Sequence, residues 1–413
     1  MNVLFIVTSY WAYGELLIAL QFAKRIQVKG YKVHFLVPPS HEKALSSCKI
    51  PYTILIPKAG RINQVLIKDL ENTFKPQYVI LSDFINYYFC EKHYGLKVED
   101  LHIFKGKLGT FDNFDWALKR RGMDTYGYKS KVLDEVDVKN FGFRIVPCPI
   151  ANPSLQHEKE QNKFYYPLVD EFLPYDRQVK EKVRKELNLP LNKPIVLVTS
   201  AVWQQTHKLY PHVESFVEAS NKIFADTIIK SVDKGIILCV GPSELFNQKG
   251  LTSDVKTFSG LPPEIFEKYA IASDLFLSRN ITSTTLAKIA LSGIPSVVIT
   301  NSIFFKQGKR QDINLPFKPT EQVNEILNKL DICYPYSMFP VGWHTFLEPL
   351  VRQNPYMDVV INAEQFDEED TIQKIKNILE NPGVLEKFQI RANKYREIVD
   401  NLPKPDEVLK QLR

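Results

Sequence analysis

Residues 258–301 constrain the fold of this 413-residue chain more than any other stretch. Two short segments within it, residues 275–277 and 296–300, are bounded by polar residues and turn signals, as expected for strands buried in a parallel sheet. A helical pattern separates them and ends at Gly293, with Pro295 just beyond. The stretch is therefore predicted to form a strand-helix-strand unit, which requires a parallel sheet with a helical crossover.

The turn between the first of these strands and the helix is rich in hydroxyl groups. Residues 278–285 read Ser-Arg-Asn-Ile-Thr-Ser-Thr-Thr, and the helix begins within them. The first backbone N–H groups of a helix lack partners inside the helix, and the helix dipole adds a partial positive charge there. This turn is therefore predicted to bind an anion.

The alternation of strands and helices runs through both halves of the chain. A length of 413 residues exceeds one ordinary core, so we expect two α/β domains with doubly wound parallel sheets. The turn after the first strand has a single glycine in place of GxGxxG, and GxxxxGK occurs nowhere, which argues against NAD-dependent dehydrogenases and P-loop kinases. Beyond the opening stretch, strands are predicted at residues 2–7, 32–37, 52–56, 78–81, 195–199 and 235–240, with helices at residues 14–29, 177–187 and 211–230.

Composition indicates a globular protein. Hydrophobic residues make up 44% and charged residues 24%, and no apolar run approaches the length of a transmembrane helix. The apolar start is too short for a signal peptide, and the net charge of +6 is spread over mixed segments, so no nucleic-acid partner is expected. The cysteines are scattered, which favours a reducing, cytoplasmic location and excludes a CxxC metal cluster. They are Cys48, Cys90, Cys148, Cys239 and Cys333.

Residues 260–262 read Gly-Leu-Pro and precede a helix, a strand, the hydroxyl-rich helix start and a second strand opening with Gly-Ile-Pro. This order resembles the donor-binding core of the GT-B glycosyltransferases. The resemblance implies two Rossmann-like domains that face each other across a cleft. It implies an acceptor-binding domain at residues 1–165, a nucleotide-sugar-binding domain at residues 166–385, and closing helices at residues 386–413.

The turn departs from the pattern usual in nucleotide-sugar transferases of that superfamily, His-Gly-Gly-x-Gly-Thr with a Glu three residues later. Counting back from Gly-Ile-Pro places Thr285 on the Thr of the pattern. Asn280 then stands at the His position and Lys288 at the Glu position. Ile281 and Thr282 take the adjacent Gly-Gly positions. The resemblance therefore supports the fold and the donor class more than the identity of the nucleotide or sugar.

Donor-binding candidates follow the strands of the second half, because open parallel sheets bind ligands beyond the carboxyl ends of their strands. Trp203 suits stacking on a base or sugar, with buried packing as the alternative. Lys288 suits a diphosphate, with a solvated lysine as the alternative. His344 lies in a ring-rich stretch that suits closure on the donor, although a lone His is more often structural. The predicted donor-binding residues are Ser200, Trp203, Gly241, Asn280, Thr282, Ser283, Thr284, Thr285, Lys288, Trp343 and His344.

The loop after the first strand carries the acceptor-side candidates Tyr10, Trp11, Tyr13 and Gly14. In many GT-B transferases this loop ends in Gly-His, and the His takes the acceptor proton; Glu15 stands in its place here. A carboxylate can act as a base when burial raises its pKa, but at a helix start it also complements the helix dipole. Asp112 is the alternative base, and it in turn suits the cap of a helix starting near it.

These expectations define a glycosyltransferase that moves a sugar from a nucleotide-sugar co-substrate to an acceptor, which is a small molecule, a glycan or a peptide. No cofactor is expected. Metal independence is expected because no convincing Asp-x-Asp follows a strand and a helix terminus is available to stabilise the leaving diphosphate. The alternatives are a nucleotide-sugar epimerase or hydrolase on the same fold, or a catalytically silent auxiliary protein of this fold.

Overall fold

The structure is a computed structural model of the chain, and its described residues divide into two compact units. Unit 1 comprises Met1–Asp170, Thr345–Asn354 and Ile398–Arg413, and unit 2 comprises Glu171–His344 and Pro355–Glu397. Sequence analysis placed the domain boundary near residue 165, whereas unit 1 extends to Asp170. Unit 1 also includes the C-terminal residues from Ile398 onward. The residues described are 1–10, 13–82, 84, 87–113, 141–154, 162–201, 211–241, 246, 254–306, 309–311, 315–333, 347, 351 and 353–412.

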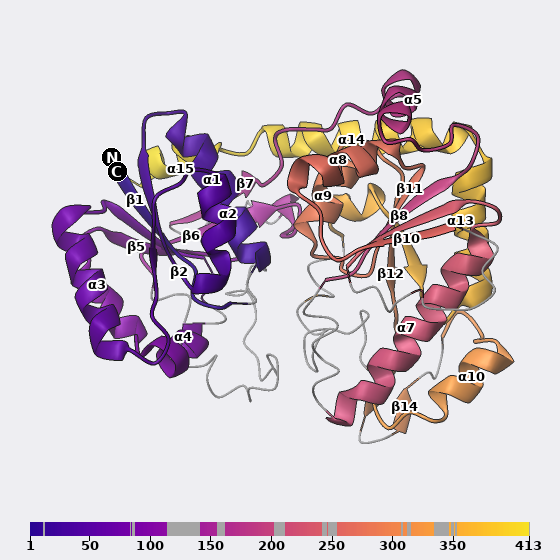
Figure 1. Cartoon of the computed structure of the whole chain (residues 1–413), viewed down its shortest axis with the longest axis horizontal. Coiled ribbons are helices and arrows are strands. Elements are labelled where there is room, and N and C mark those ends of the chain that lie inside the picture. The colour runs from indigo at the N-terminus through magenta and orange to yellow at the C-terminus, as the bar shows by residue number, and fades with distance from the viewer. Residues whose placement is uncertain are drawn as a thin grey trace. The chain divides into compact units, whose positions relative to one another are not determined.

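Unit 1 is built on a seven-stranded parallel sheet flanked by helices (Figure 1). The strand order is β3-β2-β1-β4-β5-β6-β7, so the chain reverses its direction of travel across the sheet between β1 and β4. The strands are β1 (Asn2–Ile6), β2 (Lys32–Val37), β3 (Tyr52–Ile54), β4 (Tyr78–Leu81), β5 (Lys107–Phe111), β6 (Phe143–Cys148) and β7 (Lys163–Pro167). The helices are α1 (Tyr13–Gln27), α2 (Glu42–Ser47), α3 (Gly60–Thr73), α4 (Tyr87–Tyr94) and α15 (Pro405–Gln411), with 3-10 helices η1 (Pro39–His41) and η3 (Val98–Ile103).

Aromatic side chains fill the core of unit 1 beneath α1. Phe5 of β1 stacks on Phe35 of β2 with 4.9 Å between ring centroids, and Phe22 of α1 meets Phe111 of β5 edge-on at 5.4 Å. Every apolar residue of β1 after Asn2 is buried, as expected for a central strand of a parallel sheet. This packing fixes the start of α1 above the carboxyl end of β1.

Helix α15 completes unit 1 although it comes last in sequence. The Tyr78 hydroxyl of β4 donates to Leu409 O at 3.0 Å, and Lys107 Nζ of β5 donates to Leu412 O. Leu409 and Leu412 are themselves buried. The sheet of unit 1 is therefore covered partly by residues that follow unit 2 in the chain.

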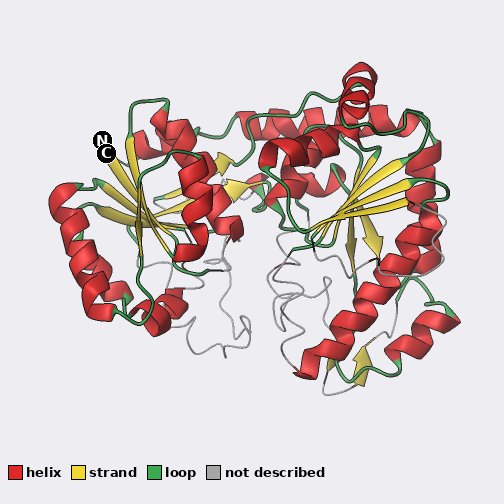
Figure 2. Ribbon diagram, in the orientation of Figure 1, coloured by secondary structure: helices red, strands yellow, loops and turns green. Residues whose placement is uncertain are grey.

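Unit 2 has a six-stranded parallel sheet in the order β10-β9-β8-β11-β12-β15, with helices on both faces (Figure 2). Its point of reversal lies between β8 and β11. The strands are β8 (Ile195–Thr199), β9 (Ile236–Val240), β10 (Asp254–Phe258), β11 (Leu275–Ser278), β12 (Ser296–Thr300) and β15 (Ile361–Glu364), and β13 (Phe304–Lys306) pairs separately with β14 (Lys309–Gln311). The helices are α5 (Arg177–Glu186), α7 (Pro211–Ser231), α8 (Pro263–Ala272), α9 (Thr284–Leu291), α10 (Glu321–Leu327), α13 (Glu368–Glu380) and α14 (Gly383–Asp400), with the 3-10 helix η10 (Pro355–Asp358).

Alternate residues of β11 face α7. Leu275 and Leu277 are buried in one core cluster with Phe224 and Ile228 of α7. The remaining apolar surface of α7 packs in a second cluster with α10 and neighbouring residues. Helix α7 therefore covers one face of the sheet at β11, while α9 contacts β11 and β12.

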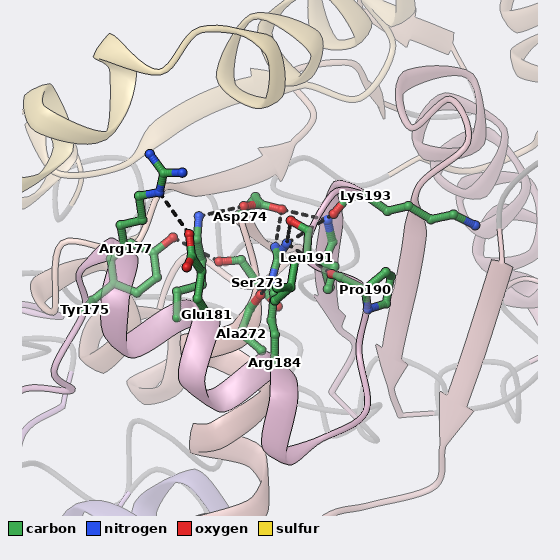
Figure 3. A network of polar contacts seen from close by, with 12 residues as sticks. Tyr175, Arg177, Glu181, Arg184, Pro190, Leu191, Lys193, Ala272, Ser273 and Asp274 are labelled. Atoms are coloured by element: carbon green, nitrogen blue, oxygen red, sulfur yellow. Dashed lines mark hydrogen bonds and ion pairs between the residues drawn. The ribbon is translucent and has the colours of Figure 1, made fainter.

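At the amino edge of this sheet, a polar network ties α5 to β8 and β11 (Figure 3). Arg184 is 3% exposed, and its Nε donates to Ala272 O at 2.8 Å. The carboxylate of Asp274 accepts from Lys180 Nζ at 2.8 Å and from the backbone N–H of Ile195 at 2.8 Å. The network thus fixes the starts of β8 and β11, the two strands that flank the point of reversal.

These two sheets confirm the predicted fold class of two doubly wound α/β domains. Most predicted elements lie where expected, including α1, α7 and the strand-helix-strand unit β11-α9-β12, although β3 ends earlier than predicted. The helix predicted to start near Asp112 would fall in residues 114–140, outside the described part of the chain. Within the described segments, no helix combines the length and the apolarity needed to cross a membrane.

Candidate functional site

The point of reversal in unit 2 brings together the loops after β8 and β11. Ligands of open α/β sheets bind at such points, beyond the carboxyl ends of the strands. Ser200 follows β8, and the turn of residues 279–283 follows β11 and leads into α9. The predicted anion-binding turn therefore lies at the position where the topology favours a ligand.

Two side chains shape this turn by bonding to its own backbone. Asn280 Oδ1 accepts from the Thr282 N–H at 3.0 Å and from the Thr282 hydroxyl at 2.9 Å. Ser283 is the N-cap of α9, and its hydroxyl oxygen accepts from the Leu286 N–H at 3.2 Å. The Ser283 N–H donates to Asn280 O at 3.2 Å. Asn280, Thr282 and Ser283 thus hold the turn and use much of their hydrogen-bonding capacity to do so.

Thr284 and Thr285 are the two residues that open α9, and both are partly exposed. Neither their N–H groups nor their hydroxyls have a hydrogen-bond partner among the residues that the structure describes. Two N–H groups at a helix start, with two hydroxyls beside them, can bind an anionic oxygen without any charged side chain. The structure narrows the predicted set of hydroxyls to these two residues as the groups free to act on a ligand.

Ser200 and Gly241 lie against each other at the same sheet edge. A Cβ at Gly241 would lie 2.7 Å from Ser200 O, and the φ of Gly241 is +141°, a conformation that favours glycine. The close approach of these two loops therefore explains why residue 241 is a glycine. Both residues remain candidates for the donor site by position.

Lys288 of α9 forms an ion pair with Glu267 of α8, with 2.5 Å between Nζ and Oε1. The predicted role of Lys288 was to neutralise a diphosphate. The ion pair directs its ammonium group toward α8 instead.

Arg279 is a second cation at this edge of the sheet, and sequence analysis did not single it out. It follows β11 directly, is 1% exposed, and is the largest fully buried side chain of the described residues. Its Nη1 donates to Asn221 Oδ1 at 2.6 Å and its Nη2 to the Ser220 hydroxyl at 2.5 Å. The available signal was a charged residue two positions after the apolar segment of residues 275–277.

Glu364 ends β15 at the same edge of the sheet. One carboxylate oxygen accepts from the N–H and the hydroxyl of Ser302 at 2.8 and 2.7 Å, and the other accepts from the Phe366 N–H at 3.1 Å. Burial raises the pKa of Glu364 to about 7 despite these bonds. The carboxylate of Glu364 thus fixes the loop after β12.

In unit 1, the acceptor-side candidates that the structure describes, Tyr10, Tyr13 and Gly14, lie at the corresponding point after β1. Tyr10 is 57% and Tyr13 is 50% exposed. Glu15 lies in the first turn of α1 and is partly exposed. A Cβ at Gly14 would meet nothing within 4 Å, so packing gives no reason for a glycine there.

His41 supports this loop from the segment after β2. It is fully buried, and its Nε2 lies 3.1 Å from Ser9 O, an atom that can only accept, so Nε2 carries the proton. The Ser40 hydroxyl donates to Tyr10 O at 3.3 Å, and the Tyr13 ring meets the His41 ring edge-on at 5.9 Å. Burial lowers the pKa of His41 to about 4. A neutral His41 therefore holds the loop that precedes α1.

Asp112, the alternative base, follows β5 and is completely buried. Its Oδ2 lies 3.4 Å from Nη1 of Arg144 in β6, which is 6% exposed. The two candidate bases therefore lie in different environments. Glu15 is a partly exposed carboxylate at a helix start, whereas Asp112 is a buried ion-pair partner of Arg144.

Comparison with known families gives a match over residues 22–412 to one described as "Family of unknown function (DUF6365)". The chain belongs to this family. No curated protein matches it.

Solved structures resemble the DUF6365 chain over its whole length. HepE from Anabaena, solved with UDP and glucose, is 13% identical with a TM-score of 0.58, and covers 100% of this chain and 98% of its own. Arabidopsis thaliana UGT89C1, solved with quercetin, is 12% identical with a TM-score of 0.57 and the same coverages. The glycosyltransferase VinC, solved with dTDP, is 11% identical with a TM-score of 0.52, again covering 100% and 98%. These likenesses confirm the predicted GT-B fold.

Four predicted site residues lie outside the described part of the DUF6365 chain: Trp11, Trp203, Trp343 and His344. Among the residues described, no group of three or more His, Cys, Asp or Glu side chains is placed to hold a metal ion. The described candidates thus consist of one helix-start site in unit 2 and one carboxylate-bearing loop in unit 1.

Proposed function

We propose that this chain is a glycosyltransferase that binds a nucleotide-sugar donor on unit 2 and an acceptor on unit 1. The observation that carries the proposal is the pair of N–H groups of Thr284 and Thr285, which open α9 at the point of reversal of a GT-B sheet. HepE and VinC were solved with UDP and dTDP, so proteins of this fold bind nucleoside diphosphates.

In the proposed reaction, an acceptor hydroxyl or other nucleophile attacks C1 of the donor sugar. The bond between C1 and the diphosphate oxygen breaks, and the nucleoside diphosphate leaves with the electron pair. The N–H groups and hydroxyls of Thr284 and Thr285 stabilise the charge that develops on the leaving phosphate. Because these hydrogen-bond donors are fixed in place before the reaction, little reorganisation of the protein is needed to stabilise the leaving group. A metal ion is then unnecessary for this step.

Glu15 is the proposed base that takes the acceptor proton. It is partly exposed beside Tyr13, at the start of α1, whereas Asp112 is buried against Arg144. A base must reach the proton that it removes, so the accessible carboxylate fits the role better. Tyr10 and Tyr13 offer exposed rings on which an acceptor can stack.

Thermal shifts against UDP, GDP, ADP, CDP and dTDP, each paired with its nucleoside, test the proposal directly. A ligand at about 100 times its dissociation constant should add ~2.7 kcal/mol to stability. One base is expected to respond, and its diphosphate should bind more tightly than its nucleoside. Five diphosphates without effect would contradict the proposed donor site.

Once a donor is known, products measured with and without acceptor separate transfer from hydrolysis or epimerisation. Donor consumed only with acceptor supports transfer, and donor bound but never consumed supports an auxiliary protein. Turnover should survive EDTA, and loss with EDTA followed by recovery with Mg²⁺ or Mn²⁺ would overturn metal independence.

A further inference from the structure

Helix α3, which flanks the sheet of unit 1, carries apolar side chains on its outward face as well as on its buried face (Figure 1). Ile67 and Leu70 are buried, whereas Ile62 is 51% and Val65 is 65% exposed. Ile62 and Val65 lie three positions apart, so they are neighbours on the helix surface. The outward face of a surface helix is usually polar, and this one therefore calls for a partner.

The loop before α3 is fastened to the helix and adds a third exposed apolar side chain, that of Ile56. Asn63 Oδ1 accepts from the Ile56 N–H at 2.9 Å, and Asn63 Nδ2 donates to Ile56 O at 2.8 Å. The Lys58 N–H donates to His93 O of α4 at 2.7 Å. Ile56 and Lys58 therefore lie on a fixed backbone beside the first turns of α3.

The same stretch is positively charged. Residues 56–68 contain three cations, Lys58, Arg61 and Lys68, and no acidic residue before Asp69. All three cations are exposed, and none has an ion-pair partner within the described part of the chain. Their charges are therefore available to an anionic partner.

The positive potential extends around the start of α3. The N-cap residue, Ala59, makes no side-chain hydrogen bond to the first turn, so no capping group offsets the partial positive charge of the first N–H groups. In α4, burial and then the charges of Lys92 and Lys58 lower the pKa of His93. Basic groups from two elements thus lie close together at this end of α3.

Apolar and basic side chains are interleaved on the outward face. Val65 lies four residues after Arg61 and three before Lys68, so both cations are its neighbours on the helix surface. Arginine and lysine can lay their methylene stems along apolar surface while their charged ends reach outward. Helices that lie in a membrane interface use this combination, since aliphatic side chains enter the headgroup region and cations pair with anionic headgroups.

A protein or a nucleic acid fits this face less well. Protein interfaces are depleted in lysine, valine is rare among their hot spots, and a stable complex takes roughly 20–30 residues a side. This face spans two turns of one helix and the loop before it. Nucleic-acid phosphates would use the cations and leave Ile62 and Val65 without a role.

We propose that this face of unit 1, termed the α3 surface, docks peripherally on an anionic phospholipid bilayer. The α3 surface consists of Ile56, Lys58, Arg61, Ile62, Val65 and Lys68. Docking of this kind needs no membrane-spanning helix, and it is independent of the proposed transfer reaction.

Flotation of the full chain with lipid vesicles tests the proposal. We expect binding to vesicles of equal parts phosphatidylglycerol and phosphatidylcholine, and little binding to phosphatidylcholine alone. Binding should weaken as salt is added, because the Debye length falls from about 10 Å at 0.1 M to about 3 Å at 1 M.

Charge reversal locates the electrostatic part of the binding. Each cation near an anionic membrane strengthens binding by about fivefold, so Arg61→Glu combined with Lys68→Glu should weaken it by more than about tenfold. The matched control is Lys387→Glu combined with Arg391→Glu on α14, where two exposed cations flank the exposed Ile390. Binding of the control should stay close to that of the unmodified protein.

Substitution of the aliphatic residues tests contact with the lipid. Ile62→Ser combined with Val65→Ser keeps every charge and should weaken binding roughly tenfold, while Ile390→Ser should not. Val65→Trp gives a direct readout, because brominated acyl chains should quench the added tryptophan more than the four native ones. All these side chains are exposed, so the variants are expected to fold.

An unmodified protein that does not float with the anionic vesicles would overturn the proposal. Equal losses in the α3 and α14 charge reversals would also overturn it, since they would indicate general attraction by the net charge of +6. Full binding by the Ile62→Ser, Val65→Ser double variant would exclude docking by this face. Binding of duplex DNA without binding of vesicles would assign the cations to a nucleic acid instead.

Discussion

Nη2 of Arg184 donates to Oδ2 of Asp274 at 2.5 Å, and the same guanidinium donates to the carbonyl oxygens of Pro190, Leu191 and Lys193 through Nη1 (Figure 3). The pair joins α5 to the residue that precedes β11. Because Asp274 also accepts from the Ile195 N–H, one carboxylate sets the relative position of β8 and β11.

Asp274→Asn should therefore destabilise unit 2 strongly. Removing one partner of a largely buried ion pair leaves the other charge without compensation, which costs about 3–5 kcal/mol. Urea unfolding of the variant and the unmodified protein measures the loss. Arg177→Gln is the control, because its pair with Glu181 is exposed and should contribute about 0–1 kcal/mol. Similar losses in both variants would refute the structural role assigned to Asp274.

Thr284→Pro should weaken diphosphate binding while the protein stays folded. Thr284 is the first residue of α9, where proline fits because the N–H has no partner inside the helix. The preceding Ser283 has φ −69° and ψ 124°, a conformation compatible with a following proline. Thr284→Val keeps the N–H and removes the hydroxyl. Calorimetric titration of the two variants therefore separates the contribution of the N–H to binding from that of the hydroxyl. Unchanged binding in Thr284→Pro would rule out this placement of the diphosphate.

Glu15→Gln should keep donor affinity and lose on the order of 100-fold or more in turnover if Glu15 is the base. Asp112→Asn should act differently, because it breaks the buried pair with Arg144 and so lowers stability by about 3 kcal/mol or more. Turnover and urea unfolding of both variants distinguish the roles. A folded, inactive Asp112→Asn beside a nearly normal Glu15→Gln would transfer the role to Asp112.

Gly14→Ala should stabilise unit 1 and impair use of the acceptor. Alanine favours a helix over glycine by up to about 1 kcal/mol, and a Cβ at Gly14 meets no atom within 4 Å. The glycine therefore has no packing purpose in the described structure, and close approach of a ligand would explain it. We expect a higher melting temperature with a raised KM for the acceptor and unchanged donor affinity. Unchanged acceptor kinetics would exclude Gly14 from the acceptor site.

Unit 1 should lose stability in acid through His41. Its pKa is about 4 in the folded protein against 6.5 for the free side chain, so the unfolded state binds more protons between these values. The stabilisation from a neutral His41 is fully present above pH 6.5 and falls by about 1.4 kcal/mol per unit as the pH drops to 4, about 3 kcal/mol in all. His41→Gln keeps a donor for Ser9 O without titrating. Unfolding curves measured from pH 4 to 7 should be flatter for this variant, and equal slopes would contradict the assignment.

The sheets could be predicted because their signals are local. Residues 275–277 and 296–300 are short, bounded segments, and Gly293 with Pro295 marks a helix end wherever the rest of the chain lies. The anion-binding turn was found for the same reason, since a helix start needs only its own residues. Because the turn follows a strand of a parallel sheet, the order of elements along the chain also predicted that it lies at the carboxyl ends of the strands.

The hydrogen-bond and ion-pair partners of individual side chains could not be predicted, because many of these partners are distant in sequence. Arg279 bonds to Ser220, 59 residues earlier, and Lys288 to Glu267 on a different helix. Nothing in the local pattern separates a buried arginine after a strand from an exposed one. The partner of the Asn280 and Ser283 side chains was likewise assumed to be a ligand, whereas both side chains accept hydrogen bonds from backbone N–H groups of their own turn and helix start.

The return of residues 398–412 to unit 1 has a consequence for synthesis on the ribosome. More than 200 residues separate Asp170 from Ile398, and translation at about 5–20 residues per second takes roughly 10–50 s to cover them. During that interval unit 2 is synthesised, while the nascent unit 1 lacks the helix that binds Tyr78 and Lys107. The part of the protein made first is therefore the part completed last, and its open sheet is the surface that a chaperone would meet.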